Sequence, residues 1–436
     1  MTDLAALFNH HLAERQRTTA EALAETGFDA LVISSGKVYT YFADDHDAPF
    51  HPVPHFAHWC PITGPHHLLV VRAGQRPRLI RYAPEDFWYE QLPLGAPFWA
   101  EAFDIEEVGT VEAAWEKVGT LRRTAYIGNE TDRAEAAQLD VNPPLLTAHL
   151  DWHRTTKSAY EVQSIEEATV IAARGHRAAR TSFLSGASEL EIHHAYMQAA
   201  GLVDHELPYG NIVALNEKGA TLHYEGKRTV RNGAVLLIDA GAQVRGYAAD
   251  ITRTLAAPHC DVRFAALIHG MESIELQLCN LVKPGLPYGD LHHQGHLLIA
   301  GLLKEQGILL ADPAEALEKG LSRPFFPHGL GHHLGLQVHD VAGKQGAPDG
   351  TSAPPPAQYP TLRTTRTIEA DQVFTVEPGL YFIPMLLRPF RENEHKALFN
   401  WKLIDELTPC GGIRIEDNLL VTSTGHRNLT RPHLPT

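Results

Sequence analysis

The second half of the chain carries carboxylates where its strand patterns should be apolar. Four acidic residues lie at the ends of apolar segments or among apolar neighbours: Asp239, Asp250, Glu377 and Glu416. A lone carboxylate in apolar surroundings is destabilising unless it is paired or bound to a metal ion. The basic residues nearby in the sequence are too few to pair all four. Because one divalent cation compensates several carboxylates at once, the pattern predicts a metal centre.

A glycine-rich segment between residues 327 and 340 supplies a second type of donor. It holds four histidines: His328, His332, His333 and His339. Glycines at 329, 331 and 335 let the backbone approach a ligand closely. The chain has 27 histidines, so any one of them is more often a solvated loop residue, but the cluster indicates an imidazole ligand. The glycine spacing does not match a dinucleotide-binding fingerprint.

The first 150 residues alternate strand-like and helix-like patterns, which is typical of a small α/β domain. We expect a helix over 4–26 and short strands near 30–34, 67–72 and 124–128. The polar, proline-rich segment 43–56 reads as a long loop. We place the domain boundary near 155, which gives an N-terminal domain of residues 1–155 and a catalytic domain of residues 156–436.

The second domain combines long helical patterns with short apolar strands, so the fold class is α/β (α+β). We expect helices over residues 161–185, 189–200, 260–282 and 288–306, with Ser188 as the N-cap of the second. Strands are expected over residues 233–239, 247–254, 373–379 and 412–421. The proline-rich segment 343–366 should be an irregular excursion.

Charge and cysteine content exclude other classes of protein. Lys and Arg number 37 against 52 Asp and Glu, so the net charge of −15 argues against binding to nucleic acid. The four cysteines, Cys60, Cys260, Cys279 and Cys410, are far apart in the sequence and form no C-x-x-C motif. They indicate buried thiols in a reducing compartment. With no leader pattern and no long apolar run, we expect a cytoplasmic protein that does not bind membranes.

Five local strings occur in one order along the chain: 237–241, 247–254, 328–332, 376–381 and 413–417. Together they resemble the five-ligand dimetal site of the pita-bread metallopeptidases, a family that includes methionine aminopeptidase, aminopeptidase P and prolidase. Segments 44–56 and 85–89 resemble the bacterial prolidase (Xaa-Pro dipeptidase) branch, which also contains enzymes described as organophosphorus acid anhydrolases. The resemblance implies a small N-terminal α/β domain followed by a pita-bread metallopeptidase domain.

The resemblance also implies a set of metal ligands. Asp239 would chelate one ion, Asp250 and Glu416 would bridge both ions, and His332 and Glu377 would complete the second. Carboxylates with one imidazole and no thiolate suit Mn²⁺, and Co²⁺ or Zn²⁺ can substitute. We therefore expect two divalent ions per subunit. Two ions about 3.5 Å apart can hold a bridging hydroxide that is available as a nucleophile at neutral pH.

The remaining site residues follow from the same resemblance. Glu377 would also shuttle a proton to the leaving imide nitrogen, and His223 and His339 would bind the substrate and the tetrahedral intermediate. The predicted substrate-binding residues are Arg363, Arg414, His328, Tyr209 and Asp45. Arg363 would read the substrate carboxylate, and Arg414 would support the metal ligands. Asp45 would bind the substrate amino group in the neighbouring subunit of a homodimer.

The function implied is hydrolysis of Xaa-Pro dipeptides. One alternative is an aminopeptidase P that acts on longer Xaa-Pro peptides, but the loop 43–56 and Arg363 favour the dipeptidase. A remote alternative is a non-catalytic pita-bread protein that binds peptides; such relatives lack the metal ligands, whereas all five are present here. Organophosphate triesters are possible secondary substrates, because their tetrahedral phosphorus centre resembles the tetrahedral intermediate of amide hydrolysis.

Overall fold

The computed structural model describes residues 3–435 and divides into two compact units. The N-terminal unit extends to Arg154 and also includes Ser158–Glu161 and Gln345–Ser352. The C-terminal unit comprises Thr155–Lys157, Val162–Lys344 and the chain from Ala353 onward. Among the helices formed by residues 3–435, none is long and apolar enough to cross a membrane.

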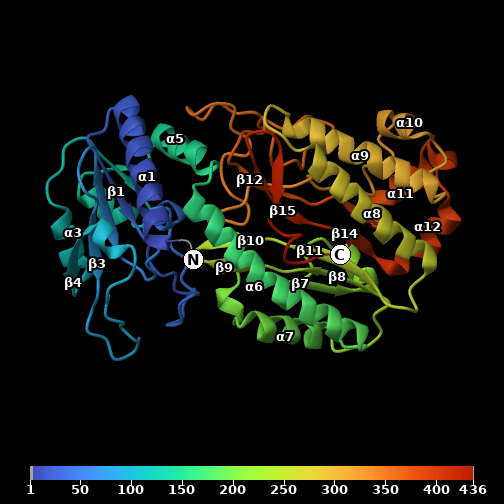
Figure 1. Ribbon diagram of the computed structural model, residues 1–436, viewed down its shortest axis with the longest axis horizontal. Helices are drawn as coiled ribbons and strands as arrows, with labels where there is room; N and C mark the ends of the chain where they lie inside the picture. The colour runs from blue at the N-terminus through green and yellow to red at the C-terminus, as the bar shows by residue number, and fades with distance from the viewer. Residues whose placement is uncertain (1–2, 436) are drawn as a thin grey trace. The chain divides into compact units, whose positions relative to one another are not determined.

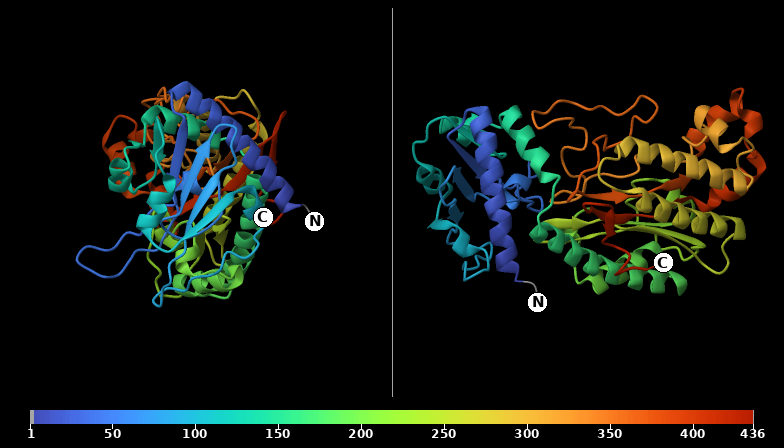
Figure 2. Two further views of the ribbon diagram at one scale, coloured as in Figure 1. Left: turned by 90° about the vertical axis from the view of Figure 1, so that its left-hand side faces the viewer. Right: turned by 45° about the horizontal axis from the view of Figure 1, so that its top comes forward.

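The N-terminal unit is built on one mixed sheet with the strand order β4-β3-β2-β1-β5-β6 (Figure 2). Its strands are β1 (Ala30–Ser34), β2 (Leu68–Arg72), β3 (Arg78–Tyr82), β4 (Asp104–Val108), β5 (Thr124–Ile127) and β6 (Asp140–Val141). The central strand β1 pairs antiparallel with β2 and parallel with β5. Every residue of β1 is buried, which explains its continuous apolar sequence and confirms the predicted strand.

Helices flank this sheet: α1 (Leu4–Thr26), α2 (Pro54–Ala57), α3 (Val111–Val118), α4 (Thr131–Ala136) and α5 (Pro144–Arg154), with the 3-10 turn η1 (Ala100–Ala102). The predicted helix over 4–26 is confirmed. It begins behind Asp3, whose side chain accepts two backbone hydrogen bonds, and ends at Gly27 in the left-handed region. Helix α5 is missing from the sequence prediction, because two prolines begin it and polar residues interrupt its apolar face.

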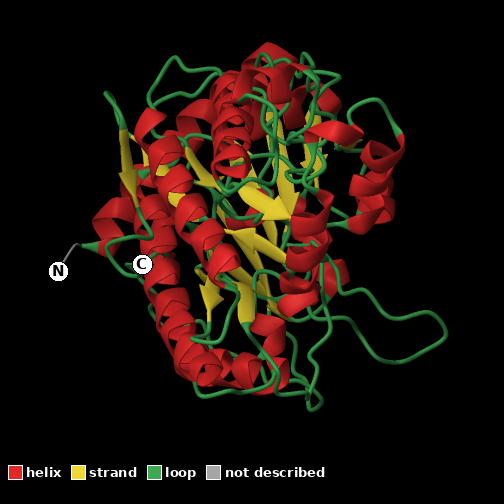
Figure 3. Ribbon diagram, turned by 90° about the vertical axis from the view of Figure 1, so that its right-hand side faces the viewer, coloured by secondary structure: helices red, strands yellow, loops and turns green. Residues whose placement is uncertain are grey.

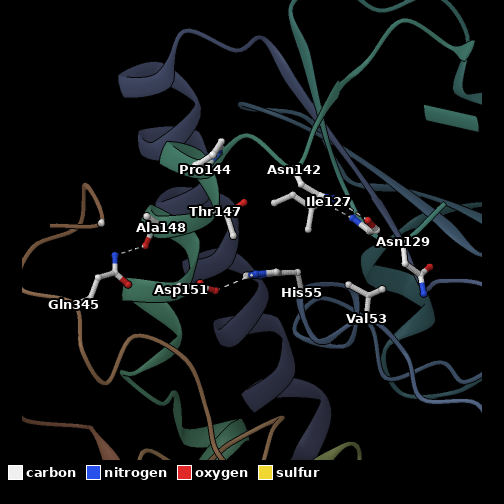
Figure 4. A pocket seen from close by; sticks show the side chains of 12 residues that line it. Val53, His55, Ile127, Asn129, Asn142, Pro144, Thr147, Ala148, Asp151 and Gln345 are labelled. Carbon is white, nitrogen blue, oxygen red and sulfur yellow. Dashed lines mark hydrogen bonds and ion pairs between the residues drawn. The ribbon is translucent and has the colours of Figure 1, made fainter. Parts of the chain in front are cut away.

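The irregular excursion predicted over 343–366 contributes its segment Gln345–Ser352 to the N-terminal unit. Figure 4 shows the Gln345 side chain beside α5, where its Nε2 donates to the carbonyl of Ala148 at 2.9 Å. The same side chain lines a cavity of about 690 Å³. None of the predicted site residues, all of which the structure describes, lies in the wall of this cavity.

The C-terminal unit contains two three-stranded antiparallel sheets, β11-β8-β7 and β12-β15-β16, and two strand pairs, β10-β9 and β13-β14. The strands are β7 (Ile212–Leu215), β8 (Val235–Asp239), β9 (Ala242–Val244), β10 (Tyr247–Ala249), β11 (Thr252–Ala256), β12 (Val373–Val376), β13 (Gly379–Tyr381), β14 (Gly412–Arg414), β15 (Asp417–Val421) and β16 (His426–Asn428). The expected strands at 233–239, 247–254 and 373–379 are therefore present, in shorter pieces.

Helices lie on both sides of these strands (Figures 1 and 3). The helices are α6 (Ala159–Leu184), α7 (Glu189–Ala200), α8 (Val262–Leu281), α9 (Tyr288–Glu305), α10 (Pro313–Glu318), α11 (Pro384–Glu392) and α12 (Trp401–Leu407), with the 3-10 turns η2 (Asp204–Glu206), η3 (Asn216–Ala220), η4 (Lys396–Leu398) and η5 (Thr408–Cys410). Side chains of α6 and α7 pack on β7 and β8, and those of α8 and α9 pack with β12 and β15. All four long helices match the predicted ranges closely.

The prediction of one strand over 412–421 is wrong. The chain forms β14 and β15, which belong to different sheets, and the break falls at Ile415–Glu416. At the break, the Glu416 backbone N–H donates to the carbonyl of Thr252 at 3.0 Å. Glu416 thus leaves the strand pairing of its neighbours and turns toward β11.

Directly after the break, Asp417 lies fully buried between two arginines. Arg253 NH2 donates to its Oδ1 at 2.7 Å, and Arg431 Nε contacts its Oδ2. Arg431 also binds Glu275 at 2.6 Å, and Arg253 NH1 donates to the Glu416 carbonyl at 2.8 Å. This buried ion network fixes the backbone on which Glu416 is carried.

Replacing Asp417 should therefore destabilise the protein strongly. In Asp417→Ala, the buried guanidinium of Arg253 and the partly buried one of Arg431 lose their shared carboxylate, so we expect a loss of about 3–5 kcal/mol in the apparent free energy of unfolding. The control is Asp405→Ala, which removes the exposed ion pair with Arg391 and should cost less than about 1 kcal/mol. Urea denaturation of both variants measures the difference, and equal losses would contradict this account of the network.

Candidate metal centre

Two of the predicted ligands come from the sheet β11-β8-β7. Asp239 is the last residue of β8 and pairs with Thr252 across the ladder to β11. Asp250 lies between β10 and β11 and is buried. The two carboxylates therefore arise from antiparallel neighbouring segments, and the charge of Asp239 disfavours ionisation of Asp250.

The other three predicted ligands come from β12 and the segments beside it. Glu377 follows β12, and its backbone N–H donates to the carbonyl of Leu330 at 2.8 Å. The backbone N–H of Thr375 donates to the carbonyl of His332 at 2.9 Å, so His332 is held against the same strand. Glu416 lies between β14 and β15, and its Oε2 accepts a hydrogen bond from Thr252 Oγ1 at 2.6 Å.

These five side chains converge in the structure. His332 Nε2 lies 3.5 Å from Asp250 Oδ2 and 3.5 Å from Glu377 Oε1. One donor atom from each of Asp250, His332 and Glu416 can be chosen so that all lie within 4.8 Å of one another. His332 Nδ1 faces its neighbour's carbonyl at 3.1 Å, which places the proton on Nδ1 and leaves the Nε2 lone pair facing the carboxylates.

The cluster has the chemistry that a cation requires. Asp239 Oδ1 is buried and has no hydrogen-bond partner among residues 3–435. Burial, followed by the charge of Asp239, raises the pKa of Asp250 well above its ordinary value. Burial raises the pKa of Glu377 to about 7 and lowers that of His332 to about 3. Carboxylates this close cannot all stay ionised by themselves, whereas divalent cations would satisfy them together.

Arg414 supports this cluster through Asp239. Its NH2 donates to Asp239 Oδ2 at 2.6 Å, and its NH1 donates to the hydroxyl of Tyr381 at 2.8 Å. Arg414 and Glu416 do not lie on one strand, because β14 ends at Arg414. The arginine instead approaches Glu416 through Thr252, whose Oγ1 lies 3.3 Å from Arg414 Nε.

Three contacts at the site are not predicted from the sequence. Tyr209, expected only as a pocket wall, donates its hydroxyl to Asp250 Oδ1 at 2.6 Å. Thr252 orients Glu416, and Tyr381 lies 2.9 Å from His328 Nε2. Thr252 and Tyr381 belong to the local strings 247–254 and 376–381. Their place in these strings is the sequence signal that could have assigned them to the site.

The histidines predicted to face the substrate lie around the cluster. His328 Nδ1 is 2.8 Å from the Gly329 carbonyl, and Arg414, Tyr381 and His328 form a hydrogen-bonded chain in that order. The ring of His339 lies 4.4 Å from that of His332, and His339 is partly exposed to solvent. Burial, followed by the charge of Arg363, lowers the pKa of His339 to about 4, so the ring is neutral at physiological pH.

Arg363 and His223 are exposed, and both lie near enough to lower the pKa of His339. The charge of Arg363 also offsets part of the rise in the pKa of Glu377, though less than the charge of Arg414 does. The structure therefore places eleven of the twelve predicted site residues in the C-terminal unit. Asp45 lies exposed in the N-terminal unit, and its role stays a prediction.

Two further clusters of His, Cys, Asp or Glu occur in the described part of the chain: His11, His58 and Glu161, and Glu275, Cys279 and Asp417. In each cluster, at least one member already contacts an arginine side chain. Arg15 NH1 lies 3.1 Å from His58 Nε2, and Arg431 binds both Glu275 and Asp417. Because these guanidinium groups supply the compensating charge, neither cluster needs a metal ion.

Comparison with known proteins identifies the family. The model of metallopeptidase family M24 matches residues 163–423, and the model of the Xaa-Pro dipeptidase N-terminal domain matches residues 6–152. The chain belongs to metallopeptidase family M24. The resemblance to bacterial prolidases is thereby confirmed, and so is the predicted fold, a small N-terminal α/β domain with a pita-bread metallopeptidase domain.

Relatives in this family match over their full length. The Xaa-Pro dipeptidase of Pseudoalteromonas atlantica is 44% identical, with 99% of each chain covered. The Xaa-Pro dipeptidase of Stenotrophomonas maltophilia is 43% identical, with 99% of this chain and 98% of the relative covered. They confirm the prediction of a hydrolase, an Xaa-Pro dipeptidase of the metallopeptidase class.

Solved structures confirm the fold. Proline aminopeptidase P II from Yersinia pestis superposes with a TM-score of 0.73 at 23% identity, covering 99% of this chain and 97% of that one. Aminopeptidase P from E. coli with the inhibitor Pro-Leu gives a TM-score of 0.72 at 24% identity, covering 97% and 96%. The alternative prediction of an aminopeptidase P has structural neighbours, while the relatives closer in sequence are named as dipeptidases.

Gly331 shows how closely the backbone approaches this site. A Cβ atom built on Gly331 would lie 2.0 Å from the Thr375 carbonyl oxygen, a backbone atom that cannot move aside. We expect Gly331→Ala to displace His332 and to weaken Mn²⁺ binding at least tenfold in titration calorimetry. The control is Gly289→Ala in α9, where a Cβ meets nothing within 4 Å. Unchanged Mn²⁺ affinity in Gly331→Ala would contradict the assignment of His332 as a ligand.

Proposed function

We propose that the chain hydrolyses Xaa-Pro dipeptides at a centre of two divalent cations, with Mn²⁺ as the resident ion. Asp239, Asp250, His332, Glu377 and Glu416 would hold the cations. The observation that carries this proposal is the convergence of Asp250, His332, Glu377 and Glu416, together with an Asp239 Oδ1 that is buried and unpartnered among residues 3–435. A set of oxygen donors with one imidazole suits Mn²⁺, and Co²⁺ or Zn²⁺ can take its place.

When bound, the two cations supply a hydroxide nucleophile at neutral pH and polarise the scissile carbonyl. The residues of the chain supply the remainder of the chemistry. Glu377 takes a proton at its carboxylate and delivers it to the imide nitrogen, which must be protonated as it leaves. His223 and His339 donate hydrogen bonds to the substrate carbonyl and to the tetrahedral intermediate. His328 and Tyr209 line the pocket.

The proposal is tested by Ala-Pro hydrolysis. We expect metal-stripped protein to release no proline, added Mn²⁺ to restore the reaction, and Glu377→Ala to stay inactive with Mn²⁺. The exposed Glu394→Ala serves as the control and should behave as the parent protein. Release of proline by metal-stripped protein, or full activity of Glu377→Ala, would contradict the proposal.

Arg363 is proposed to restrict the enzyme to dipeptides by binding the free carboxylate of the substrate. Its guanidinium is exposed and lies near the candidate metal centre, as its effects on Glu377, His332 and His339 indicate. A guanidinium pairs with a carboxylate through two parallel hydrogen bonds, which an internal peptide carbonyl cannot accept in the same way. Longer Xaa-Pro peptides should therefore be poor substrates.

Arg363→Ala should raise KM for Ala-Pro, because a charged hydrogen-bonding partner is lost. A loss of about 1.5–3 kcal/mol corresponds to a fall in kcat/KM of roughly 10- to 150-fold. The same variant should distinguish Ala-Pro from its C-terminal amide much less than the parent protein does. Arg388→Ala, an exposed arginine on α11, is the matched control. An unchanged preference for the free carboxylate in Arg363→Ala would disprove the assignment.

We also propose a homodimer, with Asp45 reaching the site of the second copy to bind the substrate amino group. The support is two groups of large exposed side chains in the N-terminal unit: Tyr39 and Phe42, which are near Asp45 in sequence, and Phe87, Trp88 and Tyr89. Phe42 is fully exposed, which is unfavourable in a monomer.

The four cysteines are unpaired, which supports the proposed cytoplasmic location. Hydrolysis of organophosphate triesters stays a prediction.

A further inference from the structure

The segment that carries His223 has no secondary structure of its own. Residues 221–234 form neither helix nor strand. Leu222 and Tyr224 pack against a cluster that includes Leu237 and Tyr381, whereas His223 between them is exposed. Within residues 3–435, the imidazole of His223 makes no hydrogen bond or ion pair. Its position therefore depends on what holds the residues on either side of it.

One buried carboxylate holds the segment on the C-terminal side of His223. Glu189 is completely inaccessible to solvent and accepts five hydrogen bonds. Two reach Oε2, from the Tyr224 hydroxyl at 2.8 Å and from the Arg228 backbone N–H at 2.7 Å. Three reach Oε1, from Arg228 Nε at 3.0 Å, Arg228 NH2 at 2.8 Å and the Leu215 backbone N–H at 3.0 Å.

The contacts of Glu189 join the loop to regular structure on both sides. Glu189 is the first residue of α7, behind the N-cap Ser188, and Leu215 ends β7. The backbone N–H of Leu190 adds a hydrogen bond to the Arg228 carbonyl at 3.2 Å. A negative charge is favourable at the N-terminus of a helix. The loop is thus fixed to the start of α7 and to the end of β7, and we call the contacts of Glu189 with Tyr224, Arg228 and Leu215 the Glu189 clamp.

The protonation states suit this clamp. Burial would raise the pKa of Glu189, but the hydrogen bonds from Arg228 and the backbone lower it below its ordinary value. Burial and the hydrogen bond to Glu189 raise the pKa of Tyr224 to about 12. Glu189 is therefore charged, and Tyr224 remains a donor, throughout the physiological range. The residue next to His223 is fixed by a charge-assisted hydrogen bond.

We propose that Glu189 is a positioning residue for His223 and that it acts through Tyr224 and Arg228 on the placement of the imidazole. The inference rests on the proposed role of His223 in binding the tetrahedral intermediate. Glu189 itself touches neither the substrate nor the metal ligands. Loosening the clamp should therefore lower the rate of the chemical step and leave the metal content unchanged.

The experiment is a double-variant cycle on Ala-Pro hydrolysis by the Mn²⁺-loaded protein. We expect His223→Ala to lower kcat about 100-fold, the scale of losing one donor to an oxyanion. Glu189→Gln keeps the shape of the side chain and should lower kcat about tenfold, with KM changed less than about threefold. In the His223→Ala background, Glu189→Gln should change kcat by less than about twofold, because the group on which it acts is gone.

Two more variants separate positioning from a loss of folding. Tyr224→Phe keeps the ring and removes one hydrogen bond to Glu189, so it should lower kcat less than Glu189→Gln and be equally silent in the His223→Ala background. Glu217→Gln removes the exposed ion pair of the same Arg228, through NH1 at 2.8 Å, and should match the parent protein. Thermal unfolding and Mn²⁺ content are measured for every variant.

The outcomes are distinct. A loss of kcat in Glu189→Gln that disappears in the His223→Ala background supports the inference. The inference is overturned if Glu189→Gln retains the parent kcat, or if its loss persists undiminished beside His223→Ala. Full activity of His223→Ala alone removes the proposed role of His223, and the inference with it. That result would leave the metal-dependent reaction, tested separately through Glu377, unaffected.

Discussion

The C-terminal unit is organised around the repulsion between four carboxylates that share one buried site. Like charges at this separation cannot remain ionised in a protein interior without a compensating cation. Among the four, and within residues 3–435, only Asp239 forms a side-chain ion pair with an arginine, Arg414. The remaining negative charge is what two divalent cations would balance. Without cations, the repulsion between the carboxylates destabilises the folded state. The arrangement therefore indicates a site that binds cations.

The fold meets this cost by fixing the backbone around each donor. Asp239 and Asp250 lie beside the ladder of β8 and β11, and His332 and Glu377 are hydrogen-bonded across the end of β12. Glu416 lies at the break between β14 and β15, directly before Asp417, which forms a buried ion pair with Arg253. Rigid attachment of this kind holds donors at the geometry of an ion before the ion arrives. His223, His339 and Arg363, which are predicted to meet the substrate, lie instead outside helices and strands.

Much of this architecture is encoded locally and could be predicted. The helix over 4–26, the buried strand over 30–34 and the helix that Ser188 begins follow from caps and apolar runs in neighbouring residues. The acidic residues stood out because they interrupt apolar segments. The order of five strings then indicated the family, which the comparisons confirm.

What could not be predicted depends on contacts between residues distant in sequence. The bond from Tyr209 to Asp250 spans 41 positions, and that from Arg414 to Asp239 spans 175. The break in 412–421 arises because Glu416 pairs with Thr252 instead of continuing its strand. Glu189 carries no pattern that distinguishes it from an ordinary residue in the first turn of a helix.

The count of metal ions per chain tests the central claim most directly. The protein is stripped of metal, reloaded with Mn²⁺, desalted and measured by elemental analysis beside Asp239→Asn. Five donors that hold two cations predict two Mn²⁺ per chain in the parent protein and one or fewer in the variant. A parent protein that retains no more than one ion, or a variant that retains two, would contradict the proposed centre.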